Sequence, residues 1–123
     1  MILIDTSRWI PALRRSGDPH ARVRVAELLM LGEAAWCDMV LLELWIGCGS
    51  AKERAKLREM AAVIPSLPTT PEVWKESFRL AERCRSQGKT VPASDLLIAA
   101  CANIHAVQVE HDDRHFDLIA SVG

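Results

Sequence analysis

Four short apolar runs, separated by segments with helical spacing, are the feature that most restricts how this chain can fold. The runs are predicted strands and cover residues 2–4, 34–37, 63–67 and 107–109. Strands that alternate with helices favour a parallel sheet that is covered by helices on both faces. We therefore predict an α/β fold, a three-layer α/β/α domain with a short parallel sheet of about four strands.

Capping residues and apolar spacing place the predicted helices. Asp5 and Asp18 are predicted N-caps, and Thr70 with Pro71 opens a later helix. The expected helices cover about residues 5–13, 18–32, 39–47, 52–59, 70–88, 92–102 and 113–120. In the second helix the spacing predicts a buried face formed by Val23, Ala26, Leu29 and Met30. In the fifth helix it predicts one formed by Trp74, Phe78, Ala81 and Cys84.

The overall composition is typical of one globular domain, which we expect to cover residues 1–123. Half of the residues are hydrophobic, and no segment approaches the ~20 apolar residues that span a membrane. No signal peptide is evident, and the four cysteines form no C-x-x-C pair, so we expect a cytoplasmic protein with reduced, buried thiols. With 15 Lys and Arg against 16 Asp and Glu, the chain is not a strongly basic nucleic-acid coating protein.

Four acidic residues stand at positions that point to a shared site. Asp5 and Asp113 follow predicted strands at their carboxyl ends, where ligands of open parallel sheets bind. Asp95 lies in the first turn of its helix, and Glu43 lies among apolar neighbours, where a charge needs compensation. Taken one at a time, each residue has a simpler explanation. Asp5 and Asp113 could each be only a helix cap, Asp95 could be only a first-turn acid, and Glu43 could lie on an exposed strip. Together they would repel one another, and a divalent cation such as Mg²⁺ would relieve that repulsion.

Four segments, in this order and spacing, resemble PIN-domain proteins, and among them the toxins of bacterial VapBC toxin–antitoxin pairs. The segments are residues 2–7 (ILIDTS), 42–47 (LELWIG), 91–102 (VPASDLLIAACA) and 111–119 (HDDRHFDLI). The acidic residues of that family fall on the four carboxylates named above, and its small hydroxyl residue falls on Thr6, beside Ser7. The resemblance implies cleavage of RNA that depends on Mg²⁺ or Mn²⁺. It also implies a homodimer, and a partner antitoxin that blocks the active site.

The closing motif departs from the family in two respects. Asp112 precedes Asp113, and we assign the metal-binding role to Asp113, which stands three residues before Phe116 as in the family, with Asp112 in support. His115 occupies a position where another acid is common. The sequence also ends soon after the last predicted helix, so a final edge strand found in many relatives is expected to be absent or short.

Other polar and aromatic residues are candidates for contacts with RNA. These candidates are Arg8, Arg14, Lys52 and His115. Arg and Lys could position phosphates without reading bases, although the charged stretch 52–59 is also typical of a solvated helix face. The four tryptophans are mostly at core-facing spacing, and Trp45 could instead stack on a base or line a groove for a partner helix. His111 and His115 have a zinc-like spacing, but no Glu lies between them, so a zinc site is not favoured.

Two other functions compete with a nuclease. A catalytically silent domain of the same fold would bind RNA or a protein partner without metal-dependent turnover, and the four filled acidic positions argue against it. A phospho-acceptor receiver domain has a similar size and acids at a sheet edge. It would need paired acids near the first strand and a late Lys, whereas Asp5 stands alone and no Lys follows Lys89.

Overall fold

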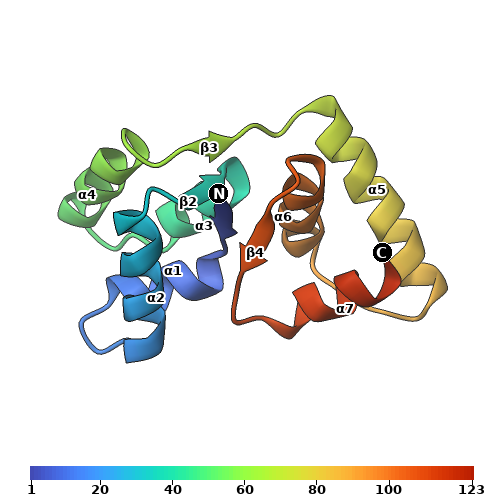
Figure 1. Cartoon of the computed structure of the whole chain (residues 1–123), viewed down its shortest axis with the longest axis horizontal. Coiled ribbons are helices and arrows are strands. Elements are labelled where there is room, and N and C mark those ends of the chain that lie inside the picture. Colours follow the sequence, from blue (N-terminus) through green and yellow to red (C-terminus); the bar gives the residue numbers. More distant parts are fainter.

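The computed structural model describes residues 1–123 and contains one sheet of four parallel strands (Figure 1). The strands are β1 (Ile2–Ile4), β2 (Ala34–Cys37), β3 (Ser66–Leu67) and β4 (Gln108–Glu110), in the order β3-β2-β1-β4. Leu3 pairs with Ala35 of β2 on one side and with Val109 of β4 on the other. The predicted α/β class and parallel sheet are confirmed.

Two strand boundaries differ from those predicted. The fourth strand begins one residue later than expected, and the third has only two residues instead of the five predicted. The amides of Val63 and Ile64 donate to the Met60 carbonyl, at 3.1 and 2.9 Å, and so complete the end of the preceding helix. Because these amides are used there, and Pro65 has none, the strand can begin only at Ser66.

Seven helices surround the sheet. They are α1 (Thr6–Leu13), α2 (Pro19–Met30), α3 (Asp38–Ile46), α4 (Ala51–Ala61), α5 (Pro71–Ser86), α6 (Ala93–Ile104) and α7 (Arg114–Val122). The side chains of Asp18 and Thr70 accept amide hydrogen bonds at the starts of α2 and α5, as the capping pattern predicts. No strand follows α7. None of the seven helices combines the length and the apolar character needed to cross a membrane.

The hydrophobic core lies on both faces of the sheet. All four residues of β2 are buried, which requires cover on both sides because neighbouring side chains in a strand point to opposite faces. In Figure 1, α1 and α2 lie together on one side of the strands, and α5, α6 and α7 lie on the other. Trp9 and Trp36 are fully buried, with ring centroids 5.4 Å apart. All four cysteines are free, and Cys48 alone is partly exposed.

The face of α2 that packs inward is not the predicted one. Val23 is 67% exposed and Met30 87% exposed, whereas Ala21, Val25 and Leu28 are buried. Apolar residues occupy more than one side of this helix, so two sets satisfy the helical spacing. Helix α2 packs against α1, and only one of the two sets is buried in the structure.

The predicted buried face of α5 is likewise wrong for its aromatic residues. Trp74 and Phe78 are exposed and contact each other, with ring centroids 6.5 Å apart. The buried positions are Val73, Ser77, Leu80 and Cys84, one residue out of phase with the prediction except at Cys84. Ser77 can be buried because its hydroxyl donates to the Val73 carbonyl at 2.9 Å.

Candidate metal centre

The strand order places two of the predicted acidic residues beside each other. The chain progresses from β1 to β2 and β3 in one direction, and then crosses to β4 on the other side of β1. Crevices form at the carboxyl ends of strands where the order reverses in this way. Asp5 follows β1 and caps α1, and Asp113 follows β4 by three residues and caps α7. The main chain joins the two strands here, because the Asp5 amide donates to the Glu110 carbonyl at 2.9 Å.

Thr6 and Ser7 hold two of the carboxylates. The Thr6 hydroxyl donates to Glu43 Oε1 at 2.9 Å, which links the start of α1 to the middle of α3. The Ser7 amide and hydroxyl donate to Asp5 Oδ2 at 3.0 and 2.6 Å. The Asp112 amide in turn donates to the Ser7 hydroxyl at 2.9 Å, whereas the Asp112 side chain is exposed and makes no hydrogen bond. One hydrogen-bonded chain thus runs from the first strand to the closing motif.

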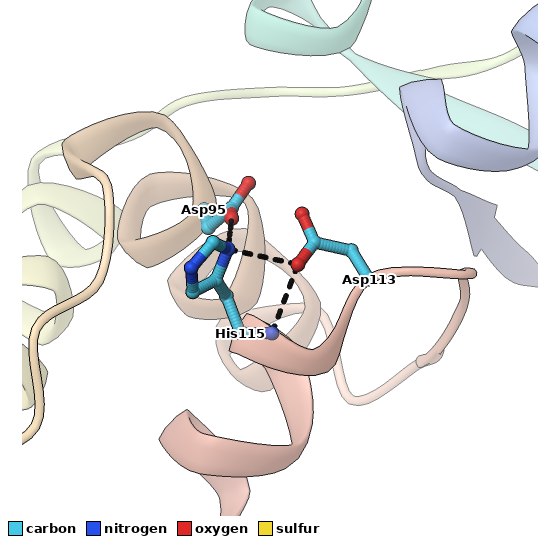
Figure 2. Close-up of side chains that lie close together, drawn as sticks. All are labelled: Asp95, Asp113 and His115. Atoms are coloured by element: carbon cyan, nitrogen blue, oxygen red, sulfur yellow. Dashed lines mark hydrogen bonds and ion pairs between the residues drawn. The ribbon is translucent and has the colours of Figure 1, made fainter.

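Asp95 and Asp113 meet at the ring of His115 (Figure 2). His115 Nδ1 lies 3.1 Å from Asp95 Oδ2 and 2.8 Å from Asp113 Oδ1. The His115 amide also donates to Asp113 Oδ1 at 2.9 Å, as part of the α7 cap. Asp95 is only 6% exposed, so its carboxylate faces the interior of the cluster.

The carboxylates perturb one another electrostatically. Burial raises the pKa of Glu43, and the charges of Asp5 and Asp113 raise it further, against the lowering effect of the Thr6 hydrogen bond. Burial also raises the pKa of Asp95, and the neighbouring Asp113 and Asp5 charges bring it to about 7. These four residues come from α3, α6 and the ends of β1 and β4, and their charges act on one another. Of the four, only Asp95 and Asp113 have ligand atoms within 4.8 Å of each other and of His115, and Asp5 and Glu43 lie outside that group.

Of Asp95 and Asp113, Asp113 is the carboxylate that stays ionised. Burial works to raise its pKa, but the hydrogen bond from the His115 amide, the interaction with Asp95 and the charge of His115 together lower it. Of the two carboxylates, Asp95 therefore takes up a proton more readily than Asp113 when no metal is bound.

A divalent cation fits this set of donors. Asp5 is 3% exposed, and its Oδ1 is buried without a hydrogen-bond partner, while Ser7 satisfies the other oxygen. A buried carboxylate oxygen without a partner is costly unless a cation compensates it. Hard divalent ions take oxygen ligands of this kind. The residues that could hold such an ion are Asp95 and Asp113, which share a group of ligand atoms, and Asp5 and Glu43, whose charges interact with them.

In the absence of metal, we expect the free energy of unfolding to decrease as the pH rises from about 4 to 7. The folded pKa of Asp95 is about 7, whereas an unfolded aspartate titrates near 3.9. Over this interval the folded chain keeps a proton that the unfolded chain releases, so stability is lost as the pH rises. Asp95→Asn should flatten this dependence and make the metal-free protein more stable than the wild type at pH 8, because the variant has no buried charge at this position.

Urea unfolding in EDTA at pH 5, 6, 7 and 8 measures this effect for the wild type and the variant. Asp112→Asn is the matched control, because the Asp112 side chain is exposed and makes no hydrogen bond. An equal pH slope in the wild type and Asp95→Asn would contradict the assignment of the proton to Asp95.

The predicted cationic RNA contacts have other partners or lie elsewhere. Arg8 Nε pairs with Glu110 at 3.2 Å, and Arg24 pairs with the same carboxylate at 3.0 Å. Lys52 is exposed on α4 and makes no hydrogen bond or ion pair. Arg14 lines an apolar groove beside α1, and no contact joins any of these three predicted cations to the acidic cluster. No local sequence signal indicated that Glu110 would engage Arg8.

The two histidines do not form a joint site. His111 packs on Phe116, with ring centroids 4.9 Å apart, and its Nδ1 accepts from the Asp113 amide at 3.3 Å. The cluster of possible ligand atoms contains Asp95, Asp113 and His115, and does not contain His111. The structure therefore does not bring the rings of His111 and His115 into one group of ligand atoms.

The apolar groove has a volume of about 500 Å³ and lies between α1, α3 and α4. Ile10, Leu44, Leu57 and Met60 form its floor, and Arg14, Glu53 and Lys56 stand at its rim. None of the four clustered acids lines it. Trp45 lies on the other side of Leu57, where the Arg58 guanidinium covers its ring at 4.9 Å. This contact makes Trp45 less available to stack on a base.

The sheet and the acidic residues define a parallel α/β protein with carboxylates gathered near one edge of the sheet, and its sequence and fold are similar to those of known proteins. The sequence model of the PIN domain matches residues 2–122. The chain is 32% identical to the VapC ribonuclease Mb1587 of Mycobacterium bovis, over 99% of this chain and 93% of that protein. The chain belongs to the PIN-domain family.

Two solved structures show the same fold. FitAcB from Neisseria gonorrhoeae superposes with a TM-score of 0.79 at 23% identity, over 100% of this chain and 95% of the other. VapBC-5 from Mycobacterium tuberculosis, a member of the VapBC family of toxin–antitoxin systems, gives a TM-score of 0.59 at 28% identity, over 68% and 71%.

Proposed function

We propose that this protein is an endoribonuclease that depends on Mg²⁺ or Mn²⁺ and acts as the toxin of a type II toxin–antitoxin pair. The observation that carries the proposal is the buried, unpartnered Asp5 Oδ1 within a cluster of four carboxylates. The relative named a VapC ribonuclease, which aligns with 99% of this chain, supports RNA as the substrate. A homodimer stays a prediction from the family resemblance.

The protein's own groups prepare the site for hydrolysis of a phosphodiester. Ser7 fixes one oxygen of Asp5 and leaves the other without a partner, and Thr6 holds Glu43 in place across two helices. A divalent ion held by the four carboxylates would neutralise their repulsion and stabilise the charge that develops on the phosphate. The position of each carboxylate at a helix start, or on a hydrogen-bonded helix, keeps the site rigid before RNA binds.

We expect the purified protein to cut a mixed pool of structured RNA in Mg²⁺ or Mn²⁺, and not in EDTA. Asp5→Asn is the control for a contaminating nuclease, because Asn still caps the helix but cannot supply the charge. Cleavage that persists in EDTA or in Asp5→Asn would refute the proposal. Metal binding without any cleavage would indicate the catalytically silent alternative.

The groove between α1, α3 and α4 is a suitable surface for the expected antitoxin. Its apolar floor and its mixed charges at the rim would accept an amphipathic segment. VapBC-5, which shares the fold, is a member of a family of toxin–antitoxin systems, and this supports a protein partner for this chain. In the same cleavage assay, the product of a neighbouring reading frame for a small DNA-binding protein should suppress activity. Undiminished cleavage by a stable complex would oppose this part of the proposal.

A further inference from the structure

The ring of His115 occupies an unusual place among the carboxylates. Nδ1 is shielded from solvent but makes no well-aligned hydrogen bond, although two carboxylate oxygens lie within 3.1 Å. When Nδ1 carries no proton, its lone pair faces the same space as the oxygens of Asp95 and Asp113 (Figure 2).

The spacing of the three atoms suits ligands of one ion. Nδ1 lies 2.8 Å from Asp113 Oδ1 and 3.1 Å from Asp95 Oδ2. Adjacent ligands of an octahedral ion with bonds of about 2.1 Å are about 3.0 Å apart. All three side chains can offer atoms within 4.8 Å of one another. The three atoms could therefore contact one cation with only small movements.

Asp5 gives an independent indication that a cation belongs here. Its side chain is almost completely buried, and its Oδ1 has no partner. The Asp5 charge raises the pKa of both Glu43 and Asp95, so the Asp5 carboxylate lies near the group formed by Asp95, Asp113 and His115. The site thus combines oxygen donors from acids with one nitrogen donor.

We propose that His115 is a ligand of the divalent ion through Nδ1, and that it biases the site toward first-row transition ions such as Mn²⁺ over Mg²⁺. This inference rests on the metal centre of the proposed function. Mg²⁺ strongly prefers oxygen ligands, whereas imidazole suits transition metals. His115 is therefore a specificity-determining residue for the metal, at a position that the sequence makes a candidate for contact with RNA and, with His111, for a zinc site.

Metal binding by the full chain tests this directly, without a cleavage assay. Calorimetric titration with Mn²⁺ and with Mg²⁺ is compared for the wild type, His115→Asp and His115→Asn. Both variants keep the backbone amide that caps α7 and replace the nitrogen donor by oxygen. The ratio of Mn²⁺ affinity to Mg²⁺ affinity should fall by about 10-fold or more in each. An unchanged ratio, or equal gains for both ions, would show that His115 is only a counter-charge and would overturn the inference.

Pulsed electron paramagnetic resonance of bound Mn²⁺ gives a second test that needs no altered fold. The wild type, labelled with ¹⁵N-histidine, should show coupling of the ion to a directly bound ¹⁵N, and His115→Asn should lose it. Bound Mn²⁺ without nitrogen coupling would refute the His115 assignment and leave the carboxylate centre intact. Failure of the wild type to bind any Mn²⁺ or Mg²⁺ would instead refute the metal centre of the proposed function, and this inference with it.

Discussion

Asp113→Asn should lower the rate of RNA cleavage by about 100-fold or more, whereas Asp112→Asn should leave it within about threefold of the wild type. The Asp113 carboxylate lies in the cluster, 2.8 Å from the His115 ring. The Asp112 side chain is exposed, and only its amide contributes, by donating to Ser7. The rates are measured with one RNA substrate at saturating Mn²⁺.

The comparison of these two variants separates an effect on RNA cleavage from an effect on folding. Asn caps helices about as well as Asp, so the hydrogen bond from the His115 amide to residue 113 can persist in Asp113→Asn. Circular dichroism and the thermal midpoint should therefore stay close to those of the wild type. A large loss in Asp112→Asn with normal cleavage by Asp113→Asn would reverse the register that we assign to the closing motif.

Trp36→Ala should lower the free energy of unfolding by about 3–5 kcal/mol, a large part of the 5–15 kcal/mol typical of a domain. Trp36 is fully buried in β2, packs against Trp9 and donates from its indole to the Ser66 hydroxyl at 3.1 Å. Its removal leaves a cavity in the core beside β2 and takes away the hydrogen bond that the indole donates to the Ser66 hydroxyl of β3. Urea unfolding followed by circular dichroism at constant pH gives the value.

Trp74→Ala is the matched control, because Trp74 is 47% exposed on α5 and packs on Phe78 at the surface. We expect it to change the free energy of unfolding by less than about 1 kcal/mol. Should Trp36→Ala not fold, Trp36→Phe should still fold and lose roughly 1–3 kcal/mol. Equal losses at positions 36 and 74 would contradict the assignment of β2 to the core.

The sequence was enough to predict where helices lie and where they start. It was not always enough to predict which face of a helix is buried. Asp18 and Thr70 signal helix starts through local hydrogen bonds that need no tertiary contact. Met30 and Phe78 satisfy the helical spacing of a core face and are nevertheless exposed. In α2 and α5, two neighbouring sets of residues fit the same spacing, and the contacts of α2 with α1 and of α5 with α6 select one of them.

The sequence by itself determined the parallel α/β order and the approach of Asp5 to Asp113, because strand ends and caps are local properties and parallel strands align their carboxyl ends. Only the tertiary structure decided which atoms are satisfied. Ser7 uses one oxygen of Asp5 and leaves the other bare, Glu110 engages Arg8, and the His115 ring of α7 meets Asp95 of α6. The Ser7 contact is local, but the pair of Arg8 and Glu110 depends on how α1 lies beside β4, and the contact of His115 with Asp95 depends on how α6 and α7 pack. No local spacing specifies that packing.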